Sequence, residues 1–121
     1  ALIHYFYDNN IPQCIISNGN GTMIKQKLSD LKLTKYFSEI IGHESGFALK
    51  PNPSSALHIC KQYSVKNDEN VWFIGDSPQD MEFAMHARIR GINAQNGLDS
   101  VWKVIYEKCQ NHDTINNNNK T

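Results

Sequence analysis

Apolar residues recur at two different spacings along this chain, and the two spacings alternate. Short apolar runs, long enough for a strand and too short for a helix, predict buried strands at residues 13–17, 39–42, 71–74 and 89–94. The third run holds four consecutive large apolar residues, a pattern typical of a strand that is covered on both faces in a parallel sheet.

Between these runs, apolar residues recur every three or four positions, as they do on one face of a helix. The first helical segment covers residues 1–9, and the last begins at Asp99 or Ser100. The inner faces of the predicted helices are formed by Ile3, Phe6 and Tyr7; by Ile24, Leu28 and Leu31; by Ala56, Cys60 and Tyr63; by Met81, Phe83 and Met85; and by Leu98, Val101, Ile105 and Cys109.

Two helix starts carry capping signals. Asn52 followed by Pro53 predicts an N-cap with proline in the first helical position. Ser77 and Asp80, with Pro78 between them, have the spacing of a capping box, in which each residue's side chain accepts from the other's backbone N–H. The second start follows directly on the apolar run at residues 71–74.

Helices and strands alternate throughout, which predicts a parallel sheet with helices on both faces, a Rossmann-like three-layer α/β/α fold. No repeat and no shift in composition divides residues 1–109, so we expect one structural unit there. From residue 110 the sequence becomes polar and rich in asparagine, and residues 110–121 are predicted to form a disordered tail.

Composition excludes several classes of partner. The 121 residues include 12 basic and 12 acidic side chains, so no global field attracts nucleic acid. No apolar run approaches the roughly 20 residues of a membrane span. The three cysteines show neither a CxxC pair nor a Cys/His metal spacing, which favours reduced thiols and a cytoplasmic protein.

Polar residues follow the predicted strands at the edge where such folds bind ligands. Ser17, Asn18 and Gly19 end the first strand, and Asp76 ends the third. Asp80 lies one helical turn after Asp76, and Lys50 precedes a helix start. Hydroxyl and amide donors with a lysine suit a phosphate, and carboxylates suit a hard cation such as Mg²⁺.

These residues resemble three motifs of the haloacid dehalogenase superfamily. Ser17 after an apolar strand resembles the second motif, Lys50 in Lys-Pro-Asn-Pro the third, and the GDxxxD sequence of residues 75–80 the fourth. The order and spacing agree over about residues 2–97. The KPxP form is similar to the branch that includes phosphoglycolate phosphatases, β-phosphoglucomutases and 2-haloacid dehalogenases.

The resemblance implies a role for each residue. Ser17, the amides of Asn18 and Gly19, and Lys50 would bind the substrate phosphate, with Lys50 stabilising charge during transfer. Asp76 would bind Mg²⁺. Three roles are open for Asp80: holding the metal through water, orienting Lys50, or closing the capping box with Ser77. Relatives usually have glycine where this chain has Arg88, so the preceding helix either ends differently or Arg88 reaches back to its last carbonyls.

The first motif of the family, DxDx[TV], and the helical cap are absent from the sequence. Asp8, Asp30 and Asp68 lie outside any such motif. The family's strand order, 5-4-1-2-3, implies that the chain lacks the central first strand, so its first and third strands would lose a shared partner. Buried unpaired backbone groups cost about 1–3 kcal/mol each. We therefore expect the missing N-terminal half in the same protein, a strand-swapped second chain, or direct closure of the gap.

The sequence as a whole predicts the C-terminal part of a Mg²⁺-dependent phosphatase for a small phosphorylated metabolite. The reaction would pass through an aspartyl-phosphate whose nucleophile lies outside this chain, so the chain alone is expected to be inactive. One alternative is a non-catalytic protein that binds a phosphorylated ligand or a partner. Another is a phosphomutase. C–halogen hydrolysis is disfavoured by Asp76, because the dehalogenases of this family need no metal.

Overall fold

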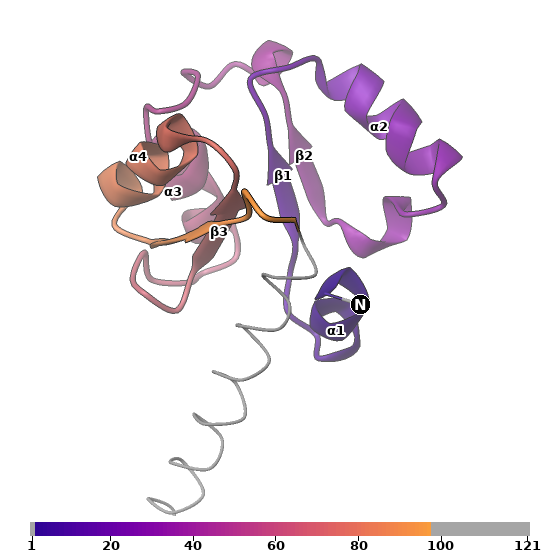
Figure 1. Cartoon of the computed structure of the whole chain (residues 1–121), viewed down its shortest axis with the longest axis horizontal. Coiled ribbons are helices and arrows are strands. Elements are labelled where there is room, and N and C mark those ends of the chain that lie inside the picture. The colour runs from indigo at the N-terminus through magenta and orange to yellow at the C-terminus, as the bar shows by residue number, and fades with distance from the viewer. Residues whose placement is uncertain (1, 98–121) are drawn as a thin grey trace, which may run out of the picture.

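A computed structural model describes residues 2–97 of the chain and places helices and strands where the sequence pattern predicts them (Figure 1). The predicted last helix, with its stripe from Leu98 to Cys109, and the predicted tail at 110–121 lie outside the described residues. The helices are α1 (Leu2–Asp8), α2 (Gly21–Asp30), α3 (Ser54–Gln62) and α4 (Pro78–Ala87). The strands are β1 (Cys14–Ile16), β2 (Glu39–Ile41), β3 (Trp72–Gly75) and β4 (Arg90–Asn93), and short 3₁₀ turns lie at Thr34–Tyr36 and His43–Ser45.

The four strands form two separate two-stranded parallel sheets instead of one continuous sheet. β1 pairs with β2, with Ile15 opposite Ile40, and β3 pairs with β4, with Phe73 opposite Gly91. β1 and β3 do not pair with each other. Direct closure of the gap, one of the three outcomes that the sequence allowed, is therefore not the arrangement adopted. The predicted α/β fold with parallel strands is confirmed, and no strand within residues 2–97 lies between β1 and β3.

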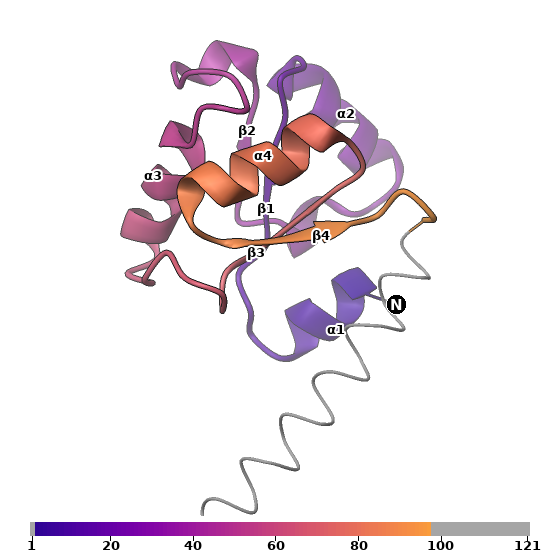
Figure 2. The same ribbon diagram turned by 60° about the vertical axis from the view of Figure 1, so that its left-hand side comes forward.

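Helices cover both faces of the divided sheet (Figure 2). On one face, Leu2 and Phe6 of α1 are buried and pack near Trp72 and Ile74 of β3. On the other face, α3 and α4 form a second cluster of buried residues. This cluster contacts both two-stranded sheets, β1–β2 and β3–β4, which are called half-sheets below. That cluster comprises Ala56, Phe83 and Ala87, with Ile16, Phe73 and Ile89 packed against it.

The helix starts follow the predicted caps with one correction. The capping box of α4 is confirmed, because the Ser77 side chain accepts from Asp80 N–H and the Asp80 side chain accepts from Ser77 N–H. The N-cap position of α3 is Pro53, one residue later than predicted. Asn52 still contributes, because its Oδ1 accepts from Ser54 N–H at 3.0 Å, the local two-residue reach that asparagine makes in turns.

Arg88 ends α4 in the conformation that glycine usually adopts. Its φ and ψ of 60° and 39° are left-handed, and Ile89 N–H donates to Ala84 O as in a Schellman motif. The helix therefore ends where glycine would end it, with an arginine in the strained position. A smaller correction concerns α2. It stops at Asp30, so Leu31, predicted to lie on the inner face, is 58% exposed.

None of the helices within residues 2–97 has the length and apolar character that crossing a membrane requires.

Candidate phosphate and metal site

Asn18 links the loop after β1 to the segment that carries Lys50. The Asn18 side chain accepts from Lys50 N–H through Oδ1 at 2.9 Å and donates from Nδ2 to Lys50 O at 3.1 Å. An amide side chain that meets both polar groups of one residue fixes that residue's backbone in place. Sequence reasoning considered only the backbone amide of Asn18, so this role of its side chain was missed.

The side chain of Lys50 is held by Asp80 at the start of α4. Lys50 Nζ lies 2.8 Å from Asp80 Oδ1, and the two side chains are only 12% and 10% exposed. The ammonium group also lies 5.1 Å from the centre of the Phe73 ring in β3. Lys50 thus extends from the β1 side of the molecule to the β3 side and brings a positive charge between the ends of the two strands.

Asp80 combines two of the three roles that the sequence left open. Its Oδ2 accepts from the N–H groups of Asp76 and Ser77 at 3.2 and 3.3 Å, while Oδ1 accepts from Lys50. Burial by itself would raise the pKa of Asp80, but the hydrogen bonds from Lys50 and Ser77 and the Lys50 charge outweigh it and lower that pKa. Asp80 is therefore a carboxylate that orients Lys50 and caps α4.

Gly75 allows Asp80 to reach this position. A Cβ atom at Gly75 would lie 2.4 Å from Asp80 Cβ and 2.6 Å from Asp80 Oδ2, closer than such atoms approach in proteins. Any side chain at residue 75 would push the carboxylate away from Lys50. Glycine is therefore required for steric reasons at the first position of the GDxxxD sequence in this fold.

Asp76 and Ser17 occupy the ends of the two half-sheets. Asp76 directly follows β3 and is exposed, and within residues 2–97 its carboxylate makes no hydrogen bond or ion pair. Ser17 directly follows β1, and its Oγ accepts from Gly19 N–H at 3.0 Å. Asn18, Lys50 and Asp80 connect the two ends, so the structure brings all the predicted site residues to one edge of the fold.

A second link between loops was not predicted. Glu44 Oε2 accepts from Gly21 N–H at 3.0 Å, and this hydrogen bond is the main reason that the pKa of Glu44 is lowered. His43 N–H donates to Gly19 O at 2.9 Å. A Cβ atom at Gly42 would lie 2.3 Å from Gly21 N, so the two loops touch through glycines. The glycines at positions 21 and 42 were the sequence signal for this close approach, but the sequence did not indicate that Glu44 accepts from Gly21.

The charges at this edge determine what it can bind. Lys50 and Asp80 neutralise each other, whereas the exposed Asp76 carboxylate has no oppositely charged partner within residues 2–97. A phosphate would meet net negative charge here unless a cation accompanied it. No group of three or more His, Cys, Asp or Glu side chains that could hold a metal occurs in the described part of the chain. One or two carboxylates with phosphate oxygens and water are, however, a common set of ligands for Mg²⁺.

This chain is similar in sequence to some known proteins and in fold to several solved structures. Phosphoglycolate phosphatase 1 of Pseudomonas aeruginosa is 30% identical over 82 residues, which is 68% of this chain and 30% of that protein. Phosphoglycolate phosphatase of Neisseria gonorrhoeae is 28% identical over 105 residues, 87% of this chain and 44% of that protein. The chain thus spans less than half the length of these two relatives.

Two solved structures are similar to this chain in fold. A HAD-superfamily hydrolase from Ehrlichia chaffeensis matches with a TM-score of 0.70 and 33% identity over 76% of this chain and 45% of its own. A hydrolase from Streptococcus pneumoniae matches with a TM-score of 0.70 and 26% identity over 84% of this chain and 54% of its own. The family model for haloacid dehalogenase-like hydrolases matches residues 1–94, and the chain belongs to that family.

Proposed function

We propose that this chain supplies the phosphate- and metal-binding part of a phosphatase that acts on a small phosphorylated metabolite. The observation that carries the proposal is the position of Lys50, which Asn18 and Asp80 hold between the ends of β1 and β3. Asp80 also accepts from the N–H of Asp76, whose carboxylate has no partner within residues 2–97. Phosphoglycolate is the first substrate to test, because the similar proteins carry its name.

In the proposed reaction, a carboxylate from outside this chain attacks the phosphorus atom. The P–O bond to the alcohol breaks, and the leaving oxygen takes a proton from a general acid that also lies outside this chain. Water then hydrolyses the aspartyl-phosphate to release inorganic phosphate. Lys50 would balance the charge of the transferring group, with Ser17 Oγ and the amides of Asn18 and Gly19 donating to its oxygens. The lowered pKa of Asp80 keeps that residue anionic, and hence Lys50 in place, throughout the neutral pH range.

Asp76 fits a Mg²⁺ ion, because its carboxylate is accessible and without a partner among the described residues. Asp80 fits less well as a direct ligand, since both its oxygens already accept hydrogen bonds. Mg²⁺, when bound, would neutralise charge on the phosphate. We place the protein in the cytoplasm, in keeping with the free thiols of Cys14 and Cys60.

Binding to the chain as it stands can be measured by NMR. Inorganic phosphate with Mg²⁺ should shift the amide signals of Ser17, Asn18 and Gly19. Asp76→Asn should abolish the response to Mg²⁺, and Lys50→Ala should weaken the response to phosphate. The matched controls Asp68→Asn and Lys61→Ala, at exposed or partly exposed residues away from this edge, should change neither. Phosphate shifts that survive Lys50→Ala unchanged would refute the proposed phosphate site.

Activity tests the catalytic part of the proposal. The chain alone, with Mg²⁺, should hydrolyse p-nitrophenyl phosphate no faster than buffer. A protein that joins this chain to a segment carrying the nucleophile should show Mg²⁺-dependent turnover that is lost in Asp76→Asn. If phosphate binds as expected but no such protein turns over any phosphate ester, the non-catalytic alternative, a phospholigand-binding protein, is the correct one.

A further inference from the structure

The two arginines of the sequence, Arg88 and Arg90, line the same pocket. This arginine pocket has a volume of about 280 Å³, and Glu69 and Ile89 complete its lining. β3 and β4 run in parallel with Trp72 opposite Arg90, so both strands begin beside the pocket. Asp76 follows the other end of β3, so the arginine pocket and the candidate phosphate and metal site lie at opposite ends of this half-sheet.

Arg88 adopts an unfavourable backbone conformation at the edge of the pocket. Its φ of 60° is left-handed, which disfavours any residue with a Cβ atom, and glycine would end α4 without that cost. Backbone strain of this kind is concentrated at functional sites in proteins. The strained arginine therefore suggests a function for its side chain.

Capping of α4 does not account for the Arg88 side chain. Within residues 2–97 its guanidinium forms no ion pair. Three of the last four carbonyls of α4 already have other donors, so they do not require a guanidinium. These carbonyls are Ala84 O, Met85 O and Ala87 O, which accept from Ile89 N–H, Arg88 N–H and Asn67 Nδ2.

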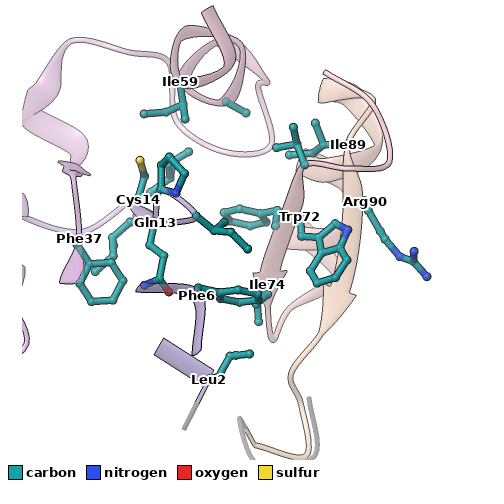
Figure 3. A pocket seen from close by; sticks show the side chains of 18 of the residues that line it. Leu2, Phe6, Gln13, Cys14, Phe37, Ile59, Trp72, Ile74, Ile89 and Arg90 are labelled. Carbon is teal, nitrogen blue, oxygen red and sulfur yellow. The ribbon is translucent and has the colours of Figure 1, made fainter. Parts of the chain in front are cut away.

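Arg90 is oriented by an aromatic side chain. The central carbon of its guanidinium lies 6.0 Å from the centre of the Trp72 ring, and Trp72 Nε1 donates to Glu69 O at 2.9 Å. Figure 3 shows Arg90 extending from β4 past Trp72, away from the groove between the two half-sheets. A cation–π contact orients a guanidinium without a carboxylate or carbonyl partner, so its N–H groups remain available to a ligand.

Charge and volume define the class of ligand. The two guanidinium groups and the Glu69 carboxylate form no ion pair within residues 2–97, and together they carry a net charge of about +1. The planar guanidinium fork matches the oxygens of phosphate and carboxylate groups. A volume of about 280 Å³ is below the range of about 300–1,000 Å³ that is typical of larger organic ligands. The pocket therefore suits a small oxyanion.

Glu69 adds a requirement, because a carboxylate repels an anion that has no hydrogen to donate. Inorganic phosphate at neutral pH keeps at least one O–H group, which can donate to a carboxylate, whereas sulfate has none. We propose that the arginine pocket binds inorganic phosphate, with Arg88 and Arg90 donating to its oxygens and Glu69 accepting from its O–H group. This second anion site goes beyond the proposed function, and its test requires no Mg²⁺.

NMR of the 121-residue chain can observe the two arginines directly, because the sequence contains no others and gives two arginine Nε–H signals. Inorganic phosphate is the probe, added in the presence of EDTA at constant ionic strength. Both signals should shift along one binding curve with a single Kd. Sodium chloride at matched ionic strength should not shift them.

Arg88→Gly is the main variant, because glycine keeps the left-handed end of α4 and removes only the guanidinium. It should weaken phosphate binding at the remaining Nε–H signal by about tenfold. Arg90→Lys keeps the charge but loses the planar fork, and it should weaken binding by about fivefold. Lys27→Ala, which removes an exposed positive charge from the last turn of α2, is the matched control and should leave binding unchanged.

Glu69 is tested by the choice of anion. Sulfate should bind about fivefold more weakly than phosphate, because it cannot donate to the Glu69 carboxylate. Glu69→Gln supplies an amide N–H donor and removes the repelling charge, so sulfate and phosphate should then bind about equally well. Unchanged discrimination in Glu69→Gln would refute the role of Glu69.

Several results would overturn the proposal as a whole. They are an absence of phosphate shifts at the arginines, equal shifts with sodium chloride, and equal losses in Arg88→Gly and Lys27→Ala. Shifts with an aspartate-rich peptide but not with phosphate would also overturn it, because the arginines would then belong to a protein-binding surface.

The two phosphate sites can fail independently. Lys50→Ala should weaken the response of Ser17 and leave the arginine signals unchanged, and Arg88→Gly should do the reverse. If phosphate shifts Ser17 but neither arginine, the arginine pocket fails and the candidate site stands. If phosphate shifts the arginines but not Ser17, the proposed function fails and the arginine pocket stands.

Discussion

The Lys50–Asp80 pair makes the sharpest prediction about stability. Removing one partner of a buried ion pair costs about 3–5 kcal/mol, because the other charge remains buried without compensation. The two side chains here are 12% and 10% exposed, so a little water reaches them and the lower end of that range applies. Asp80→Asn should therefore lower the free energy of unfolding by about 3 kcal/mol.

Lys50→Met should cost less, about 2 kcal/mol, because Asp80 keeps the N–H groups of Asp76 and Ser77 as donors. The double variant contains no unpaired charge, so its loss should scarcely exceed that of Asp80→Asn alone. The two substitutions should thus show a coupling free energy of about 2 kcal/mol.

Urea unfolding followed by circular dichroism measures all four proteins of this cycle. A stabilising osmolyte such as TMAO keeps the weaker variants folded at the start of each titration. The exposed Glu82–His86 pair of α4, 3.8 Å apart with side chains 50% and 43% exposed, provides the control cycle and should couple by less than about 0.5 kcal/mol. Additive effects of the Lys50 and Asp80 substitutions would refute the reasoning, because they would mean that the two charges do not interact.

Three further outcomes follow from the same contacts. Because the pKa of Asp80 is lowered in the folded chain, ionised Asp80 stabilises the fold fully above the ordinary aspartate pKa. The wild-type chain should therefore become less stable as pH falls below about 4. A circular-dichroism titration over that pH window should show a smaller loss of stability for Asp80→Asn. Arg88→Gly should raise the free energy of unfolding by about 1 kcal/mol by relieving the left-handed conformation, and Arg88→Ala should not. Gly75→Ala should lower the free energy of unfolding in urea by about 2 kcal/mol, because the added methyl displaces Asp80 from Lys50. The same variant should show weaker NMR shifts on addition of phosphate, and unchanged phosphate shifts would contradict this reasoning.

The alternation of apolar spacings was sufficient to predict where the elements lie. The run at 71–74 became β3, and the capping box at Ser77 and Asp80 became the start of α4. Both signals are local, since they depend on residues within one turn or one strand. The gap between β1 and β3 within residues 2–97 was also predictable, but only through the resemblance to a family whose strand order is known.

Contacts between segments distant in sequence were not predictable in this way. Nothing near Asn18 indicates that its side chain binds a residue 32 positions away, and nothing near Glu44 indicates that it caps Gly21. The conformation of Arg88 was misjudged for a related reason. Arginine on its own disfavours the left-handed conformation. The hydrogen bond from Ile89 N–H to Ala84 O nevertheless holds Arg88 in that conformation and determines where the helix ends.

The site depends on a connection between the two half-sheets. Ser17 belongs to one half-sheet and Asp76 to the other, and no strand within residues 2–97 joins the two. Their separation depends on the connection through Asn18, Lys50 and Asp80 and on the helices.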